Sequence, residues 1–550
     1  SVNNAHFELD FDDTFNTVNV STPILIEETD NTGVSNVTFR AGANYNGDSN
    51  RITNLHLNSN NDIYSEGDVQ VTFQSTDAGS NNIIDLKGIN DNTYILNLDN
   101  TDDNQINIRN SLISHILVTN TSSDNKISML NSTLNTESVI SEGTTQLSFR
   151  NMDLIKDINW DATINTTAEI EISGTYENSD ASVYRLYDAT DSAGVSGLNI
   201  RIDSVSNQSV PDFYVMELQD SKIEYINSAS NIVWDSSKLT NSSVIIEGGE
   251  YMLDGTNGLF GLKDNEFTID SLDMSSNTIT NIGTNGVSGH DEDSRYLILN
   301  SKFEDITLGG KNLNYLFKKI DLSSTSSEFQ KNININTDSN VRNLSLSIVG
   351  DITSDQTNSN CIIGASSGTA DFDNLNITIG GVLDTVNTNN IKLLVGDNNN
   401  IQLFDVEGGV LIQDSVTSEN NYFDFRNIKE MQNEVFSIES TLRLIDSPTM
   451  SDITLNSTSL KVFIDNSTIT HLINTNSEEL VMQNSQLTDF TCNSTSGQVY
   501  FNTMDVVNLS NGLASTLAAA QSGLTSAYVN CVLDTDITGV NFVADTVATG

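Results

Sequence analysis

Proline and cysteine are both scarce in this chain, which has 3 residues of each among 550. Disordered chains are usually rich in proline, lysine and glutamate and poor in β-branched residues, whereas this chain is rich in isoleucine, valine and threonine. The three cysteines, Cys361, Cys492 and Cys531, are widely spaced, which excludes a disulfide framework and a zinc ribbon. The sequence therefore predicts an ordered chain of strands and turns with buried thiols.

Basic residues are also few. The chain has 24 lysines and arginines against 74 aspartates and glutamates, which gives a formal net charge of −50. Nucleic acid and anionic membrane surfaces would be repelled by this charge, so neither is expected as a partner. An acidic surface needs counterions, which fits a salty medium such as a marine or extracellular one.

Long apolar runs are missing as well. No stretch approaches 18 consecutive apolar residues, so membrane insertion is not expected. The first residues, SVNNAHFELD, have neither the basic nor the apolar region of a secretory signal, although a processed mature form would look the same. Length alone predicts three or four domains, but one solenoid can be equally long.

A short unit recurs about every 20 residues in this chain. Alternating apolar residues are followed by an asparagine or aspartate and, in most copies, by a hydroxyl residue. Copies with asparagine are INIRNS, ISMLNS, LSFRN, FIDNS, VMQNS and VYFNT, whose asparagines are Asn110, Asn131, Asn151, Asn466, Asn484 and Asn502.

The period and the alternation predict a stack of parallel strands. A period of about 20 residues is too short for paired helices, which need about 33 or more, and apolar residues at every second place are typical of strands. Because asparagine adopts left-handed conformations readily, each asparagine predicts a tight bend at one height of the coil. We predict that the bend asparagines stack as a ladder whose amides bond one another near the core. Plain surface turns are the alternative.

The repeat also predicts where the ends lie. Residues 61–510 carry it, so 1–60 are expected to be an N-terminal lead-in or cap and 511–550 a C-terminal cap. Within the cap, Leu517, Ala519 and Ala520 have helical spacing. A short helix there would cover the open last coil and protect its unpaired backbone groups.

These residues resemble the right-handed parallel β-helix (pectate-lyase-like) proteins, which include phage tailspikes and fibres, polysaccharide lyases and adhesins. The resemblance is architectural and rests on the period and the turn asparagines. It implies an all-β, single-stranded right-handed parallel β-helix with about 18 to 21 residues per coil. It also implies a homotrimer as one possible state, because spikes of this kind are often trimers.

Catalytic motifs of that fold are hard to find here. Polygalacturonase-like enzymes carry a Gly-His-Gly and an Arg-x-Lys, but GHDEDS at residues 289–294 lacks the second glycine and no Arg-x-Lys follows. We therefore assign no catalytic residue and no cofactor site. Calcium is the one ion we consider, at Asp291, Glu292 and Asp293, because hard cations prefer several oxygens. Chance adjacency in so acidic a chain is the alternative.

Three functions fit these observations. The first is a structural and adhesive virion protein, such as a viral spike, fibre or capsid-attached component, that forms a rigid acidic support for assembly or host attachment. Its partners would be other virion proteins and host-surface glycan, and its location the virion or the extracellular space. The second is a polysaccharide depolymerase, either hydrolase or lyase. The third is a secreted cellular adhesin or surface-layer protein.

Overall fold

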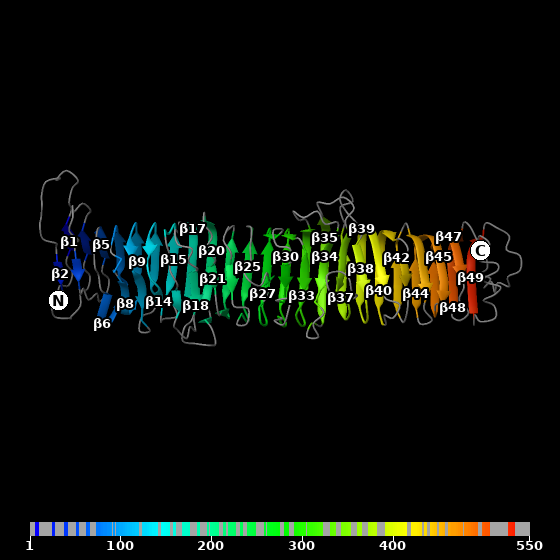
Figure 1. Cartoon of the computed structure of the whole chain (residues 1–550), viewed down its shortest axis with the longest axis horizontal. Coiled ribbons are helices and arrows are strands. Elements are labelled where there is room, and N and C mark those ends of the chain that lie inside the picture. The colour runs from blue at the N-terminus through cyan, green and yellow to red at the C-terminus, as the bar shows by residue number, and fades with distance from the viewer. Residues whose placement is uncertain are drawn as a thin grey trace, which may run out of the picture. The chain divides into compact units, whose positions relative to one another are not determined.

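The computed structural model is a series of parallel strands (Figure 1). It describes residues 6–9, 25–27, 38–41, 51–53, 62–66, 73–90, 92–93, 95–119, 124–140, 145–153, 158–160, 168–176, 184–187, 195–196, 198–207, 213–215, 218–226, 232–234, 239–248, 258–259, 261–274, 280–284, 291–303, 305–322, 330–336, 341, 343–353, 360–365, 372–381, 391–414, 420–431, 434–436, 440–447, 450–456, 460–476, 478–492, 498–506 and 526–533.

The chain divides into two compact units. Unit 1 consists of Ser1–Gly255 with Gly261–Thr268, and unit 2 of Thr256–Phe260 with Ile269–Gly550. Each is an all-β parallel solenoid, as the sequence predicts. The described part of the chain contains no helix, and thus none long and apolar enough to cross a membrane.

Unit 1 contains one main sheet, in which each coil contributes one strand, and several further sheets. The main sheet consists of β1 (His6–Leu9), β3 (Thr38–Ala41), β5 (Asp62–Glu66), β7 (Ile83–Lys87), β9 (Gln105–Arg109), β12 (Lys126–Leu130), β15 (Gln146–Arg150), β17 (Ala168–Tyr176), β20 (Leu198–Asn207), β23 (Lys222–Ile226) and β25 (Ser243–Glu247). The second sheet consists of β6 (Phe73–Ser80), β8 (Ile95–Asp102), β11 (His115–Val118), β14 (Ser138–Ile140), β16 (Ile158–Trp160), β18 (Tyr184–Tyr187), β21 (Phe213–Val215) and β24 (Ile232–Trp234). Three short pairs are β2 (Leu25–Glu27) with β4 (Arg51–Thr53), β10 (Leu112–Ile113) with β13 (Thr133–Leu134), and β19 (Val195–Ser196) with β22 (Leu218–Gln219).

Unit 2 repeats this plan. Its main sheet consists of β30 (Arg295–Leu299), β33 (Asn314–Leu322), β35 (Leu344–Thr353), β37 (Leu375–Gly380), β39 (Asn400–Asp414), β40 (Tyr422–Met431), β42 (Thr441–Ile445), β44 (Lys461–Asp465), β46 (Glu479–Gln483), β48 (Gln498–Val506) and β49 (Ser526–Leu533). A second series consists of β26 (Gly258–Leu259), β29 (Thr280–Ile282), β32 (Ile306–Leu308), β34 (Gln330–Ile335), β36 (Asn360–Ala365), β38 (Ile391–Val395), β41 (Glu434–Phe436), β43 (Met450–Asn456), β45 (Thr468–Asn476) and β47 (Gln486–Cys492). The short β28 (Asp273–Met274) pairs with β31 (Lys302–Phe303), and β27 (Glu266–Asp270) contains a boundary between the units.

Alternation of the side chains builds the core. In β9 the second and fourth residues, Ile106 and Ile108, are fully buried, and the first, third and fifth face outward. The strands on either side repeat this pattern in register, so Ile127 of β12 stacks on Ile106 and under Leu147 of β15. Inward-facing apolar residues of successive coils therefore form one continuous stack in each unit, and burial of that apolar area is the main driving force for folding.

Main-sheet strands begin or end at corners where the chain bends, except that long strands such as β33, β39 and β40 continue through a corner. The corner residue has a positive φ, as at Asp103 (54°) before β9 and Asn110 (47°) after it. Asn131, Asn151, Asn466 and Asn484 have φ values of 48°, 49°, 46° and 50°. Five of the six predicted bend asparagines are therefore confirmed as left-handed bends. Asn502 of β48 pairs in register with Gln483, which is one residue before Asn484, and its assignment as a bend stays a prediction.

The bend asparagines form a ladder, but they form it in solvent. The Asn131 amide donates to Asn110 Oδ1 (3.3 Å) and the Asn466 amide to Asp446 Oδ1 (2.6 Å), and these contacts are exposed. The Asn484 amide donates to Asp465 Oδ1 (3.0 Å), also in an exposed position. Ladder contacts near the core were expected of these residues, and the structure assigns that role to their neighbours.

Where a serine follows the bend, it points inward and bonds the neighbouring coil. Ser485 Oγ accepts from the backbone N–H of Ser467 (3.1 Å), and Ser467 Oγ accepts from that of Ser447 (3.2 Å). Before the strands, Asn104 Oδ1 accepts from both the backbone and side-chain nitrogens of Asn82, at 3.0 and 2.7 Å. These buried contacts satisfy backbone groups that the bend would otherwise leave unpaired.

Coil length varies more than predicted. Equivalent residues are separated by 18 positions at Ser467 and Ser485, by 20 at Ser447 and Ser467, and by 22 at Asn82 and Asn104. The separation reaches 31 between Asn312 and Asn343. Extra residues are added between the corners, so the strand register is kept while the loops lengthen.

Both expected caps contain strands of the solenoid. β1 and β3, which both lie within residues 1–60, pair in parallel with one another. β3 also pairs in parallel with β5, which lies just beyond that range. β49 pairs in parallel with β48 inside the expected C-terminal cap. The helix predicted around Leu517 lies outside the described residues, and the right-handed winding stays a prediction.

Candidate functional site on the outward face of the main sheet

The outward face of the main sheet is the surface on which this fold can assemble side chains. Each five-residue strand has three outward positions, and parallel register aligns them in columns whose members lie about 4.8 Å apart. Asn107, Ser128 and Ser148 form one such column across β9, β12 and β15. Residues about 20 positions apart in the sequence thus become direct neighbours.

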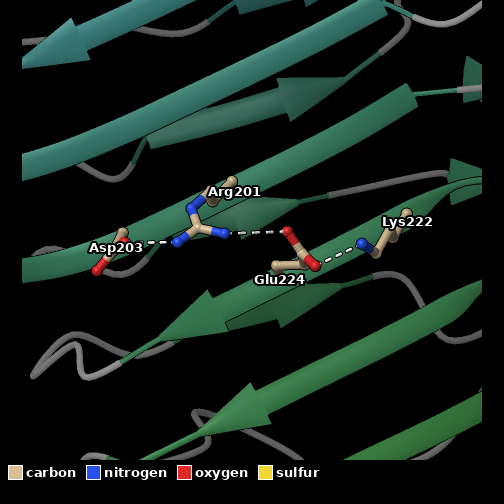
Figure 2. Close-up of polar contacts among 4 residues, drawn as sticks. All are labelled: Arg201, Asp203, Lys222 and Glu224. Carbon is tan, nitrogen blue, oxygen red and sulfur yellow. Dashed lines mark hydrogen bonds and ion pairs between the residues drawn. The ribbon is translucent and has the colours of Figure 1, made fainter.

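In unit 1, β20 and β23 place four charged side chains together on this face (Figure 2). Arg201 lies between two carboxylates, donating to Asp203 Oδ2 at 2.8 Å and to Glu224 Oε2 at 3.4 Å. Lys222 pairs with Glu224 on the other side. The side chains of Arg201 and Lys222 are 43% and 45% exposed, so the network lies open to solvent.

This network favours the charged form of each member. The hydrogen bond from Lys222 lowers the pKa of Glu224, and the Arg201 charge adds to the effect. The hydrogen bond to Asp203 raises the pKa of Arg201. A general acid for glycosidic cleavage needs a carboxyl whose pKa is raised so that it holds a proton near neutral pH. Glu224 is therefore suited to holding charge and not to donating a proton.

Unit 2 presents a second cluster, built from arginine and aromatic residues. Asp424 of β40 accepts two hydrogen bonds from Arg426, from Nε at 3.0 Å and from Nη2 at 2.8 Å. Arg443 of β42 lies 3.6 Å from the same carboxylate and donates to Tyr422 Oη at 3.3 Å. The bonds to Asp424 raise the pKa of Arg426. Asp424 is only 6% exposed, so the two guanidinium groups cover it.

Aromatic rings complete this second cluster. The Arg426 guanidinium lies 5.7 Å from the ring centre of Phe404 in β39, and the Arg443 guanidinium lies 6.0 Å from that of Phe463 in β44. Both distances are within the range of cation–π attraction. Four consecutive strands thus contribute to one half-exposed surface of guanidinium, ring and hydroxyl groups. This chemistry is suited to contact with a polar partner.

The three acidic residues at 291–293 interact with different parts of the structure. Asp291 is fully buried, and it accepts from the Glu292 backbone N–H (2.8 Å), Ser294 Oγ (2.7 Å) and Tyr296 Oη (2.5 Å). Glu292 pairs with Lys311. Asp293 has a φ of 57° and accepts from the Asn312 amide at 2.8 Å.

Calcium at this cluster stays a prediction. Because both Asp291 oxygens already accept protein donors in the core, a cation there would have to displace them. Among the residues that the structure describes, no three His, Cys, Asp or Glu side chains are arranged to hold a metal ion. The role that the geometry gives Asp291 is to hold the corner before β30.

The two charged clusters were missed in the sequence, although a signal for them exists. Opposite charges stand two places apart in Arg201-Ile202-Asp203, in Lys222-Ile223-Glu224 and in Asp424-Phe425-Arg426. Since side chains i and i+2 share one face of a strand, each triplet predicts an outward ion pair around a buried apolar residue. The joining of the first two triplets depends on register, which the sequence does not state.

Comparison with known proteins gives no further assignment, because no family model, no curated protein and no solved structure matches this chain.

Proposed function

We propose that this chain is a structural and adhesive protein of a virus particle, a spike, fibre or capsid-attached component that supports assembly or attachment to a host surface. Other virion proteins and host-surface glycan would be its partners, and the virion or extracellular space its location. A homotrimer is the oligomeric state we would test first.

The observation that carries this proposal is the double set of corner ladders around the main-sheet strands. Buried contacts such as Ser467 to Ser485, and exposed ones such as Asn466 to Asp446, add to the backbone pairing of every coil. A scaffold tied at the strands and at both corners resists bending. It also holds its outward columns of side chains at fixed intervals, which suits repeated contact with a partner.

The proposal can be tested with particles. An antibody raised against the purified chain should label virus particles in electron micrographs, and the purified chain should compete with those particles for adsorption to host cells. Absence of the chain from particles, together with no binding to cells, would contradict the proposal. Sedimentation of the purified chain would give its oligomeric state.

Two rival functions have separate readouts. A depolymerase would release reducing ends or unsaturated uronates from host polysaccharide, and would lose that activity when one of the acidic clusters of the chain is neutralised. A secreted cellular adhesin or surface-layer protein would have a precursor with a signal peptide, and would be found on cells that carry no virus.

A further inference from the structure

Three exposed cations lie on three adjacent strands of the outward face of unit 1. Arg109 ends β9, Lys126 begins β12 and Arg150 ends β15, and all three side chains are exposed. We call these three residues the basic patch. The outward positions of the three strands are Gln105, Asn107, Arg109, Lys126, Ser128, Leu130, Gln146, Ser148 and Arg150.

The composition of this surface is opposite to that of the chain. Acidic residues outnumber basic ones by 74 to 24 overall, yet these outward positions hold three cations and no carboxylate. The other outward residues, apart from Leu130, are amides and hydroxyls that can donate hydrogen bonds. Carboxylates stand on the adjacent strands, where Asp85 of β7 lies beside Asn107 and Glu171 of β17 lies beside Ser148. The basic patch is therefore a positive surface only three strands wide on a strongly negative protein.

The patch cations are not neutralised by the protein itself. Arg201 and Lys222 have carboxylate partners on the same sheet. In contrast, Arg109, Lys126 and Arg150 make no ion pair within the part of the chain that the structure describes. Their charge is thus directed at solvent and at whatever binds there.

Register determines the spacing of these charges. Arg109 and Arg150 lie in one column on either side of Leu130, so about 10 Å, or two strand spacings, separates their strands. Lys126 lies four residues before Leu130 along β12, about 13 Å away along the strand. Between them lies the amide and hydroxyl column of Asn107, Ser128 and Ser148.

We propose that the basic patch binds an acidic polysaccharide through carboxylate or sulfate groups on its sugars. Guanidinium and ammonium groups would bind the anionic groups, and Ser128 and Ser148 of the central column would donate to or accept from sugar hydroxyls. The Asn107 amide already donates to Asp85 Oδ1 at 2.7 Å. The separation of the cations matches a polymer with one charge on each sugar or every second sugar. This inference rests on the proposed attachment function and names the class of its ligand.

Other partners fit the patch less well. Duplex DNA carries one charge per about 1.7 Å of axis, a far denser spacing of charge than that of the patch cations. A protein partner would need an apolar centre rich in aromatic residues, whereas Leu130 is the only apolar residue here. At about 0.15 M salt the Debye length is about 8 Å, so the more distant carboxylates of the protein are screened while the patch acts at contact range.

The test is a binding measurement on the full chain at about 0.15 M salt. Dextran sulfate and polygalacturonate serve as sulfate and carboxylate probes, with neutral dextran as background. We expect saturable binding to at least one acidic polymer, with affinity at least about tenfold weaker in the triple variant R109Q/K126Q/R150Q. Binding of only one acidic polymer would identify the anion.

A matched control separates the patch from net charge. The triple variant R295Q/K302Q/K461Q removes the same charge from unit 2 and should bind as the wild type does. Thermal melts check that both triple variants fold, and the single variants R109Q and R150Q replace the patch triple if it does not. Equal weakening by both triples, equally tight binding of DNA, or no binding to either acidic polymer would overturn the inference.

Failure of this inference can be told apart from failure of the proposed function. If neither acidic polymer binds but the chain is present in particles and competes for adsorption to cells, the ligand class is wrong and the attachment function stands. If the polymers bind but the chain is absent from particles and from infected cell surfaces, the patch stands and the virion assignment fails.

Discussion

At corners of these coils, two adjacent residues have different structural roles. At the corner after β46, Asn484 takes the left-handed conformation in solvent, with a φ of 50°. Ser485 turns inward, accepts from Ser467 N–H and donates to the Gln483 carbonyl at 2.7 Å. The conformational and the hydrogen-bonding requirements of the bend are therefore met by different side chains.

Replacing Asn484 should cost stability through the backbone. In Asn484→Leu the apolar side chain has no local hydrogen bond to offset the left-handed φ, so we expect a loss of about 1 to 2 kcal/mol. The exposed amide contact to Asp465 adds little, because water can replace it. Chemical denaturation of the full chain measures the change.

Asn484→Gly is the control for that experiment. Glycine adopts positive φ without steric cost, so this variant should be nearly as stable as the wild type. If the leucine and glycine variants lost the same stability, the amide contact would be the important feature and the conformational explanation would be wrong.

Tyr315 is a buried phenol in unit 2 with a tightly defined site. Its hydroxyl lies 2.6 Å from the Gly309 carbonyl oxygen and 3.0 Å from that of Ile282, and its ring stacks on Tyr296 at 5.1 Å. A Cβ on Gly283 would stand 2.1 Å from this hydroxyl. Burial, reinforced by the nearby Asp291 carboxylate, raises the pKa of Tyr315 well above its usual value of 10.0.

This raised pKa predicts a loss of stability at high pH. Below pH 10 the phenol is neutral in both folded and unfolded chains, so its hydrogen bonds contribute fully. Above pH 10 the unfolded phenol ionises while the folded one stays protonated, so the native state loses up to about 1.4 kcal/mol per pH unit.

Tyr315→Phe isolates that effect. The variant should be less stable than the wild type by about 1 to 2 kcal/mol at pH 8, because buried carbonyls lose a donor. The difference should shrink as pH rises from 9 to 11. Denaturation curves of both proteins at several pH values measure it, and a difference that stays constant would contradict an elevated Tyr315 pKa.

At the scale of an element, each inner strand of the main sheet pairs on both edges. β12 lies between β9 and β15, and Ser128 at its centre faces outward between Asn107 and Ser148. No proline is found in any strand of the described chain. The scarcity of proline in the sequence thus has a direct structural reason, since proline cannot donate to the ladder.

Ser128→Pro should therefore be strongly destabilising, although the side chain is outside the core. Loss of the N–H bond leaves a carbonyl of the adjacent strand without its donor, which should cost about 1 to 3 kcal/mol, whereas Ser128→Ala should change stability by less than about 0.5 kcal/mol. Thermal melts of the two variants measure the contrast. A mild effect of the proline would mean that β12 is not paired on both edges.

At the scale of the whole molecule, the net charge of −50 opposes the folded state of a compact chain. Raising sodium chloride from about 10 mM to about 150 mM shortens the Debye length from about 30 Å to about 8 Å. We expect the melting temperature to rise over this range, with sucrose at matched osmolarity as the control for solute exclusion. A melting temperature that falls with salt would contradict net repulsion.

The solenoid itself could be predicted because its causes are local. The buried residues Ile106 and Ile108 and the bend at Asn110 can be predicted from the residues of one coil alone. The repeat then predicts the same arrangement in the next coil. Coil length was less predictable. Residues are added between the corner residues Asn312 and Asn343, which still bond one another, so the corner pattern does not reveal the extra length. The position of Asn502 relative to the other bends depends on register, because its pairing partner is Gln483 and not Asn484.

The candidate sites required more than the sequence. Ion pairs two places apart, such as Arg201 with Asp203, are implied by strand alternation alone. Their joining to Glu224, and the covering of Asp424 by both Arg426 and Arg443, come from neighbouring coils. The Asp291 cluster illustrates the converse, since three adjacent acids in sequence have three separate partners.

By itself, the sequence of this protein determined a parallel stack of coils with bends at asparagine, because strand period and left-handed preference act over a few residues. Only the tertiary structure decided which residues meet across coils, because strand register is set by pairing between segments about 20 to 30 residues apart. The serine ladder inside the corners, the two arginine clusters and the basic patch of Arg109, Lys126 and Arg150 all depend on that register.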